Sequence, residues 1–567
     1  MHDDIKKYKK FSRRSLMVTA LKLSIFSGLI SRFFYLQVLN FKKLETLSIN
    51  NKLRIFIIPA LRGLILSTNN VLMATNKVKY SLYIPKDLAN LSCTVKSLNK
   101  IISPQKIDVQ RIIAATYKYK GAKVIQLINN VTPEAIRMLR SNPDLSNVTI
   151  SKEYVRHYPF GSLLFHVLGY TRTIQNLMKN QEKKNIGYNG IEKVFDRELS
   201  GIAGIQKKEV NAHGKFIRII DTINPKLGKN LHLSVNIDIQ KIIQNAIQDK
   251  VGTIIVYDLL DMSVTALYSS PSLNANLFTT ELTKSDWQKI ANDKEKPFVN
   301  RAISALYNPG SSFKLILYLA ILTYNIKPDE TIPCPGYFRS GNRTYHCHKK
   351  YGHGLVGLDQ ALSESCNVYF YNKSLQIGIK RIKNIAKRLG LGMKTNIELS
   401  GELAGLIPDH KWKFIKFSKS WYRGDTINSS IGQGYVQTTA IQLLRMICQI
   451  ALNKKIEMSF VPNGQKFAEK KLFLNTHINR LKAALQKSIK SNQQDDLKII
   501  GKTGTSQVVS REHHKRQPKH QDHSIFIGYT QKEKKNYAIS VIIEHGGWGS
   551  KTALPLARKI FTAIHNL

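Results

Sequence analysis

Cysteine, proline and acidic residues are scarce in this chain of 567 residues, and each scarcity excludes a class of protein. Five cysteines are too few for the disulfide framework of a small secreted domain. Seventeen prolines and 33 glycines without a repeating period exclude a collagen-like or linker-dominated chain. A single long apolar run excludes a polytopic membrane protein. Apolar residues at 43% and charged residues at 22% are instead typical of a folded globular protein of about three or four structural units.

Acidic residues number 38 against 86 Lys and Arg, which gives a formal net charge of +48. Such an excess suits an anionic partner, such as nucleic acid, a membrane surface or an acidic polymer. The basic residues run along the whole chain, however, and form no arm or aromatic-interleaved stripe of the kind that binds nucleic acid. We therefore expect no nucleic-acid partner, and the function has to be read from the chemistry of particular residues.

The one long apolar run covers residues 15–39 and follows a basic segment, residues 1–14. It is longer than the roughly 20 residues needed to cross a bilayer, and its Lys22 and Arg32 are able to extend toward the nearer interface. No small-residue cleavage site follows it. Because basic flanks stay in the cytoplasm, we expect a single-pass anchor in the inner membrane, with a cytoplasmic N-terminus and the bulk of the chain in the periplasm. The alternative is a buried amphipathic helix.

Two regions of different character follow the apolar run. Residues 40–235 alternate short β-type runs, such as 53–59, 80–84 and 231–235, with turn signals. Residues 236–567 begin and end with strand-like runs (253–257, 265–269, 524–529 and 538–544) and carry helical runs (315–322 and 554–566). This order predicts an α+β layer domain in the C-terminal region.

The first chemical signal is the pair Ser311 and Lys314, which stand one helical turn apart after Pro309-Gly310. A serine hydroxyl is a poor nucleophile until a base takes its proton. A lysine is able to be that base when burial and a second cation lower its pKa. The spacing alone is weak evidence, because Ser97 and Lys100 have it as well.

Two later motifs strengthen the evidence from Ser311 and Lys314. Ser365-Cys366-Asn367 comes next, and Lys502-Thr503-Gly504-Thr505 follows a strand-like run at 497–501. A glycine on an edge strand lets a substrate backbone approach closely. The three elements in this order are the signature of serine acyl-transfer enzymes that react with penicillin.

With these elements the chain resembles the class B penicillin-binding proteins, and the elongation type more than the division type. The resemblance covers nearly the whole chain. It is carried by further motifs in both regions: Arg62-Gly63-Leu64-Ile65, Tyr158-Pro159-Phe160-Gly161, His166-Val167-Leu168-Gly169-Tyr170, Gly190-Ile191-Glu192-Lys193, Leu199-Ser200-Gly201, Asn300-Arg301-Ala302, Gly352-His353-Gly354, Gly401-Glu402, Gly405-Leu406-Ile407-Pro408, Gly424-Asp425-Thr426-Ile427-Asn428, Ile431-Gly432-Gln433-Gly434-Tyr435 and Glu544-His545-Gly546-Gly547.

Four positions depart from the family pattern. Ser67-Thr68-Asn69-Asn70 stands where Asp-Arg-Asn-Gly is usual, which puts one turn in doubt. Asn367 replaces the acid of many elongation-type members, Ser312 replaces Thr, and Ala440 replaces Pro. The change at 67–70 concerns the pedestal and not the chemistry, and Asn at position 367 is common across the wider family.

The resemblance implies an α+β protein with a single N-terminal transmembrane helix at 15–39, an elongated β-rich pedestal of the dimerisation type at 40–235, and a transpeptidase domain at 236–567. In that domain an antiparallel sheet is sandwiched by helices. The implied activity is peptidoglycan D,D-transpeptidation during elongation and rod-shape maintenance, inhibited by β-lactams and accompanied by a D,D-carboxypeptidase side activity. A SEDS-type glycosyltransferase and the elongation complex are the implied partners. The alternatives are a division-specific transpeptidase, a β-lactamase, and a catalytically minor β-lactam-binding scaffold or sensor.

The resemblance also assigns roles to residues. Ser311 is the nucleophile that attacks between the two terminal D-alanines of a stem peptide, and Lys314 takes its proton. Ser365 relays a proton between lysines and the leaving amine, and Asn367 holds a substrate amide. Lys502, Thr503, Gly504 and Thr505 belong to the strand that binds the substrate carboxylate, and the N–H groups of Ser311 and Thr505 form the oxyanion hole.

Three cysteines and one histidine predict a metal site. Cys334, Cys347, His353 and Cys366 supply three thiolates and one imidazole, which suit a tetrahedral zinc ion. Cys366 is the middle residue of the Ser-x-Asn motif, so one structural zinc would brace that loop, and the acyl transfer itself requires no cofactor. A Cys334–Cys347 disulfide and free thiols are the alternatives. His346 or His348 could also replace His353 as a ligand.

Two other groups receive simpler interpretations. Cys93 and Cys448 lie among apolar neighbours and are expected in the core. His513, His514, His520 and His523 fall in or beside a polar, basic segment, which predicts a solvated loop rather than a second metal site.

Overall fold

The structure is a computed structural model that describes residues 2–85, 91–101, 124–129, 131–145, 148–174, 184–211, 216–279, 282–461, 470–489, 497–508, 521–532 and 535–567. The chain divides into two compact units. The smaller unit combines Met1–Leu61 with Gly201–Leu227, and the larger combines Arg62–Ser200 with Gly228–Leu567. The chain thus passes three times between the units.

The smaller unit consists of a long helix and a three-stranded sheet. Its helices are α1 (His2–Phe34), a π-helical turn (Tyr35–Leu39) and α2 (Phe41–Lys52). The stretch Arg13–Leu39 is long and apolar enough to cross a membrane, and none of it is buried. Its antiparallel sheet has the order β1 (Leu53–Ile58), β8 (Gly204–Val210), β9 (Phe216–Ile223).

The N-terminal part of the larger unit is built on a long strand, β3 (Leu72–Pro85), which pairs with three others. The sheet contains β10 (Leu231–His232), β2 (Ile65–Leu66), β3, β4 (Val124–Asn129) and β5 (Thr149–His157). The remaining elements of this part are α3 (Leu91–Ile101), α5 (Pro133–Arg140), a 3₁₀ turn (Pro143–Leu145), α6 (Phe165–Leu168), the hairpin β6 (Thr171–Ile174) and β7 (Lys184–Gly187), α7 (Gly190–Val194) and α8 (Asp196–Ser200).

Glu192 on α7 ties this part together from a fully buried position. Its carboxylate oxygens lie 2.6 Å from Nε of Arg62 and 2.6 Å from Nε of Arg156 on β5. Arg62 also pairs with Asp196 at 2.7 Å. The two motifs that begin at Arg62 and at Gly190 therefore meet in one charged cluster, and removing its central acid would leave buried cations unpaired.

The C-terminal part of the larger unit contains a five-stranded antiparallel sheet in the order β12 (Ser263–Ser270), β11 (Gly252–Asp258), β19 (Tyr537–Ile543), β18 (His523–Thr530), β17 (Ile499–Ser506). β11 is apolar on both faces because both are covered. Ile254 and Val256 pack with α9 (Ile237–Ile247) and α19 (Ala553–His565), whereas Ile255 and Tyr257 belong to the core that contains α11 (Lys314–Thr323) and α17 (Ala440–Leu452).

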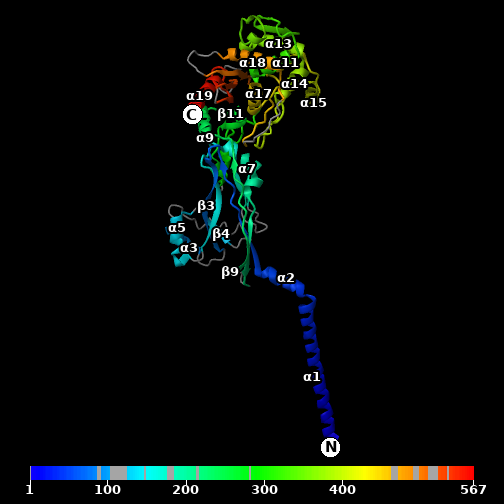
Figure 1. Ribbon diagram of the computed structural model, residues 1–567. Coiled ribbons are helices and arrows are strands. Elements are labelled where there is room, and N and C mark those ends of the chain that lie inside the picture. The colour runs from blue at the N-terminus through cyan, green and yellow to red at the C-terminus, as the bar shows by residue number, and fades with distance from the viewer. Residues whose placement is uncertain are drawn as a thin grey trace. The chain divides into compact units, whose positions relative to one another are not determined.

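Helices thus cover both faces of this sheet, as Figure 1 shows around β11. The other elements of this part are a 3₁₀ turn (Ala275–Thr279), α10 (Lys284–Ala291), a 3₁₀ turn (Gly310–Phe313), β13 (Ile332–Cys334), β14 (Tyr337–Ser340), β15 (Arg343–His346), β16 (Gly354–Val356), α12 (Leu358–Ser363), α13 (Asn367–Ile377), α14 (Ile379–Arg388), α15 (His410–Phe417), α16 (Arg423–Ser430) and α18 (Asn475–Ser488). The predicted α+β class, with an antiparallel sheet sandwiched by helices, is confirmed.

Three local expectations are refined by the structure. Lys502–Thr505 lies within strand β17, which continues the strand-like run at 497–501 as far as Ser506. The helix after Pro309-Gly310 starts as a 3₁₀ turn and becomes α-helical only at Lys314. The turn at Ser67–Asn70 forms without the usual glycine, because Asn70 adopts φ +58°, a conformation that asparagine tolerates better than most residues. The boundaries at residues 40 and 235 stay predictions.

Candidate active site

Ser311 and Lys314 lie where the 3₁₀ turn Gly310–Phe313 joins the buried helix α11. In a 3₁₀ turn, side chains three residues apart eclipse one another, so the turn directs both side chains to the same side. Ser311 is partly exposed, whereas Lys314 is completely buried. The neighbouring Ser312 is buried and donates to the carbonyl of Pro309 at 2.6 Å, which helps to hold the turn.

The ammonium of Lys314 is held by the Ser-x-Asn loop. Its Nζ donates to Oδ1 of Asn367 at 2.6 Å and to the carbonyl oxygen and Oγ of Ser365 at 2.7 and 3.1 Å. It also lies 5.7 Å from the centre of the Phe370 ring. The structure therefore joins three of the predicted site residues, although they come from segments more than 50 positions apart.

An unusual backbone conformation at Ser365 makes this arrangement. The residue has φ +58° and links α12 to α13. Its N–H donates to the carbonyl of Leu362, and the next N–H donates to that of Ala361, which ends α12. A serine in the left-handed region is strained, and such strain is typical of functional sites. Here it turns both oxygens of Ser365 toward Lys314.

Lys314 and Lys502 are a pair of buried cations. Burial and the charge of Lys502 lower the pKa of Lys314 to about 7. Burial likewise lowers the pKa of Lys502 to about 8. One lysine is thus poised to accept a proton near neutral pH while the other still carries its charge.

Strand β17 lies against the 3₁₀ turn that carries Ser311. A Cβ on Gly310, which has φ +56°, would stand 2.4 Å from the carbonyl oxygen of Thr505. A Cβ on Gly504 would stand 2.7 Å from that of Pro309. Thr503 and Thr505 are partly exposed on one face of the strand, and Lys502 and Gly504 are buried on the other. The close approach brings Gly504 and Thr505 to the Ser311 turn.

Gln433 is a site neighbour to which the sequence analysis assigned no role. Its Nε2 donates to the carbonyl of Thr505 at 3.0 Å. The adjacent Gly432 accepts a hydrogen bond from the N–H of Gly310 at 3.0 Å. The Gly-Gln-Gly motif was the available signal, and its glycines are explained by these close backbone contacts.

The four predicted metal ligands meet next to this site. The ligand atoms of Cys334, Cys347, His353 and Cys366 all lie within 4.8 Å of one another. Nδ1 of His353 is 3.5 Å from Sγ of Cys334 and 3.5 Å from Sγ of Cys347. A tetrahedral zinc ion with Zn–S of about 2.3 Å and Zn–N of about 2.0 Å requires S···N separations of about 3.5 Å. The donor set and its spacing therefore fit zinc.

The surroundings of the cluster fit the same interpretation. Nε2 of His353 faces the carboxylate of Glu364 at 4.0 Å, the side on which a metal-bound histidine usually has an acidic partner. A hydrogen bond with Cys366 lowers the pKa of Cys347, which favours its thiolate. All three cysteines are buried and free. His346 and His348 are exposed, so His353 is the better placed ligand.

The cluster contacts the acyl-transfer residues directly. The backbone N–H of Asn367 points to Sγ of Cys347 at 3.4 Å, and its side-chain amide points to the carbonyl of His346 at 3.4 Å. Because the other side-chain atom of Asn367 accepts from Lys314, the segment around Cys347 orients the amide toward the lysine.

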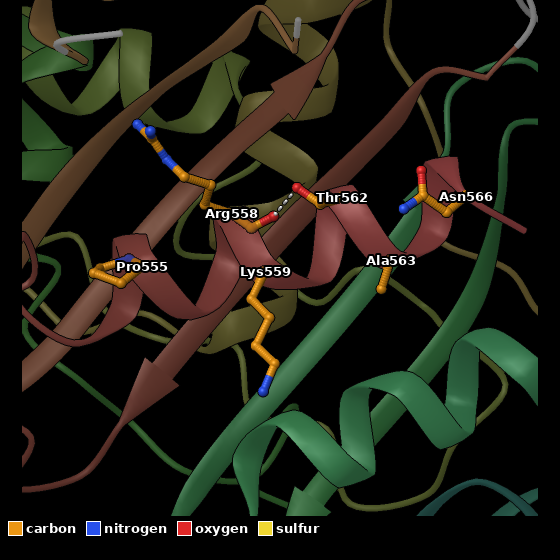
Figure 2. A pocket seen from close by; sticks show the side chains of 6 residues that line it. All are labelled: Pro555, Arg558, Lys559, Thr562, Ala563 and Asn566. Atoms are coloured by element: carbon orange, nitrogen blue, oxygen red, sulfur yellow. Dashed lines mark hydrogen bonds between the residues drawn. The ribbon is translucent and has the colours of Figure 1, made fainter. Parts of the chain in front are cut away.

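A cavity of about 490 Å³ lies elsewhere, along one side of α19 (Figure 2). It is lined by Pro555, Arg558, Lys559, Thr562, Ala563 and Asn566. None of the predicted site residues lines it, and α19 packs on the opposite face of the sheet from α11. We assign it no part in the chemistry.

The remaining sequence predictions divide into two groups. Cys448 is fully buried on α17, as expected of a core residue. His523 does not lie in the predicted solvated loop: it is partly buried at the start of β18, and burial lowers its pKa to about 4, so it is neutral at physiological pH. The side chain of Cys93 and residues His513, His514 and His520 lie outside the described residues.

Comparison with known families matches two domain models. Residues 252–562 match the penicillin binding protein transpeptidase domain, and residues 57–233 match the penicillin-binding protein dimerisation domain. The peptidoglycan D,D-transpeptidase MrdA of Haemophilus influenzae is 30% identical and covers 97% of this chain and 91% of its own length. The MrdA protein of Escherichia coli K12 is 27% identical over 95% of this chain and 92% of its own.

Solved structures similar to this chain are also penicillin-binding proteins. Penicillin-binding protein PBP2 of Helicobacter pylori, determined in complex with MreC, matches with a TM-score of 0.80 and 26% identity, over 91% of this chain and 99% of that one. PBP2 of Pseudomonas aeruginosa in complex with WCK 5153 matches with a TM-score of 0.67 and 25% identity, over 90% and 96%. Since the transpeptidase model alone spans more than half of the sequence, and the site has the three expected elements in contact, this chain belongs to the penicillin-binding protein transpeptidase family.

Proposed function

We propose that this protein is a peptidoglycan D,D-transpeptidase of cell elongation that works through an acyl-enzyme on Ser311. The observation that carries the proposal is the buried Lys314, three residues from Ser311 and hydrogen-bonded to Ser365 and Asn367. The substrate is supported by the relatives, which are named peptidoglycan D,D-transpeptidases and match nearly the whole chain.

The first half-reaction forms the acyl-enzyme. Neutral Lys314 takes the proton of Ser311 as its Oγ attacks the carbonyl between the two terminal D-alanines of a stem peptide. The N–H groups of Ser311 and Thr505 receive the developing oxyanion. The C–N bond then breaks, and the last D-alanine leaves as an amine that takes the proton back through Ser365. Asn367 holds a substrate amide during these steps.

Strand β17 supplies the binding of the donor end. The hydroxyls of Thr503 and Thr505, on the partly exposed face of the strand, receive the terminal carboxylate of the substrate, and the charge of the buried Lys502 attracts it. The glycine between the threonines allows the substrate backbone to lie along the strand. β-Lactams carry a carboxylate in the corresponding place, acylate the same serine and remain bound.

The second half-reaction makes the cross-link. The amine of a neighbouring stem peptide attacks the acyl carbonyl, loses its proton to the base and releases Ser311 as a hydroxyl. When water takes the place of that amine, the same site acts as a D,D-carboxypeptidase, which we propose as a side activity.

We propose one structural zinc ion on Cys334, Cys347, His353 and Cys366. The support is the fit of the donor atoms to a tetrahedron and the neighbouring Glu364. The ion would lock the loop that presents Ser365 and Asn367, and the acyl transfer uses only groups of the chain.

We further propose that the helix at Arg13–Leu39 spans the inner membrane with its basic end in the cytoplasm. The rest of the chain then works in the periplasm beside a SEDS-type glycosyltransferase. A place in an elongation complex is supported by the solved complex of the H. pylori relative with MreC.

The experiment that tests the function is covalent labelling of the full chain with fluorescent penicillin. We expect a stable labelled band for the wild type and none for Ser311→Ala. Ser97→Ala is the matched control, because Ser97 belongs to the other Ser-x-x-Lys sequence of the chain and should leave labelling unchanged. A label that persists in Ser311→Ala would refute the assignment, and rapid loss of label from the wild type would indicate a β-lactamase instead.

A further inference from the structure

Helix α15 exposes apolar side chains that a globular surface usually buries. Phe414, Ile415 and Phe417 are 65%, 71% and 44% exposed, and Tyr422 beyond the helix is 61% exposed. Together with Trp412 and Tyr435 they form what we call the aromatic patch. Single exposed apolar residues are ordinary, but a group of them marks a binding surface.

The centre of the aromatic patch is an ordered cluster of rings. The ring centres of Trp412, Phe417 and Tyr435 lie 5.1 to 5.6 Å apart in each of the three pairs. Nζ of the buried Lys413 lies 4.5 Å from the centre of the Tyr422 ring and forms an ion pair with Asp425 of α16. Contacts with one another and with Lys413 therefore order the rings before a ligand binds, which lowers the conformational entropy lost on binding.

The patch is joined to the active site through the loop that carries Tyr435. Asn308, three residues before Ser311, donates to the carbonyls of Gly434 and Val436 at 3.1 and 2.6 Å. In the same loop, two residues before Tyr435, Gln433 donates to the carbonyl of Thr505 on β17. A molecule that lies on the patch is thus next to β17 and to the Ser311 turn, which are proposed to bind the donor stem peptide.

The charge around the patch is positive. Residues 402–425 contain five Lys and Arg and three acids, each already engaged: Asp409 pairs with Lys383 at 2.6 Å, Asp425 pairs with Lys413, and Glu402 accepts from backbone N–H groups. Lys411, Lys416 and Lys419 are exposed beside the aromatic side chains. A ligand that suits this surface has apolar faces and carries carboxylates.

We propose that the aromatic patch binds an un-cross-linked peptidoglycan strand beside the acyl-transfer site. The apolar faces of the sugar rings lie on the aromatic side chains, and the carboxylates of the stem peptides pair with Lys411, Lys416 and Lys419. The inference rests on the proposed function and adds a substrate-binding surface outside the acyl-transfer residues. A peptidoglycan strand is favoured over a lipid surface or a protein because the patch is continuous with the acyl-transfer site.

The test measures binding of fluorescent, un-cross-linked peptidoglycan strands with intact pentapeptide stems to the full chain in detergent. The protein is acylated with penicillin beforehand, so that the strand is not consumed and the folded state of the Ser311 site is verified. Two double variants are compared with the wild type: Phe417→Ala with Tyr422→Ala, and Lys416→Glu with Lys419→Glu. Lys380→Glu with Lys387→Glu, on the exposed side of α14, is the matched control for the charge change.

We expect each patch variant to bind strands about tenfold more weakly, and the control within about twofold of the wild type. Strand affinity that is unchanged in both patch variants would overturn the inference. So would anionic phospholipid vesicles that bind the wild type and lose binding to the aromatic variant while strand affinity stays constant. A protein that penicillin does not acylate would instead refute the proposed function, so the two failures are distinguishable.

Discussion

The rate of acylation by penicillin should pass through a narrow maximum between pH 7 and pH 8. Lys314 has to be neutral to take the proton of Ser311, and its pKa is lowered to about 7 by burial and by the charge of Lys502. Lys502 has to be charged to hold the ligand carboxylate, and burial lowers its pKa to about 8. The rate therefore rises with pH through the first value and falls through the second.

The size of the effect follows from the fraction of Lys314 that is neutral and the fraction of Lys502 that is charged. At pH 7.5, midway between the two pKa values, the product of neutral Lys314 and charged Lys502 is about 0.6, and at pH 6 or pH 9 it is about 0.1. The rate should thus fall about sixfold on either side of the maximum. Negative charge on the sulfur atoms of Cys366 and Cys347 raises the pKa of Lys314, so metal content has to be held constant across the series.

The assay is the second-order rate constant for labelling by fluorescent penicillin between pH 5.5 and 9.5. Lys502→Gln should remove the alkaline fall and move the acid limb to higher pH, because the neighbouring charge that lowers the pKa of Lys314 is gone. Lys498→Gln, an exposed lysine just before β17, is the control and should keep the wild-type profile. A rate that is flat between pH 6 and pH 7.5, or an acid limb unmoved in Lys502→Gln, would refute this account of Lys314.

Three further predictions concern buried contacts. Glu192→Gln should lower the free energy of unfolding by about 3 kcal/mol or more, measured by urea denaturation, since it leaves the buried arginines without their shared carboxylate; a loss below about 1 kcal/mol would contradict this. Gly310→Ala should reduce penicillin labelling at least about tenfold because its Cβ would clash with strand β17, whereas Gly341→Ala, with a similar φ of +57° in open space, should label normally. Elemental analysis should find one zinc in the wild type and in Cys448→Ser but less in Cys334→Ser, and equal metal content in the two variants would remove Cys334 from the ligand set.

Much of the catalytic sheet was predictable because its strands are buried on both faces. Runs such as 253–257 and 265–269 read as strands from their β-branched, apolar composition, and they lie within β11 and β12. The end of β17 was placed from its motif rather than from its composition. The strand-like run stops at Gly501, and residues 502–506 continue the strand because β18 pairs with them as far as Ser506.

The smaller unit shows a different limit. Its sheet combines β1, near residue 55, with β8 and β9, which lie 150 residues later. Local patterns identify such strands one at a time but contain no information on which distant strand completes the sheet. Local patterns therefore do not show that contacts divide residues 40–235 between two compact units.

The candidate site was predicted from motifs, and the structure explains why three short motifs are enough. Each one is held by its own local device: a 3₁₀ turn under Ser311, a left-handed serine at 365, and an edge strand at 502–505. The left-handed serine is not visible in residue type, since serine rarely adopts a positive φ and nothing at position 365 announces one. The contact of Lys314 with both oxygens of Ser365 connects the first two motifs, and the close approach of β17 to the Ser311 turn adds the third.

The same contact explains why the cysteine cluster and the acyl-transfer residues belong together. The side-chain oxygen of Asn367 accepts a hydrogen bond from Lys314. Its side-chain nitrogen points to the carbonyl of His346, and its backbone N–H points to Sγ of Cys347. An amide held on one side only could flip and present its nitrogen to the ammonium, which would replace an attraction by a repulsion. Contacts on both sides remove that freedom. The cluster therefore acts on the lysine through the orientation of one amide, without taking part in the bond-making steps.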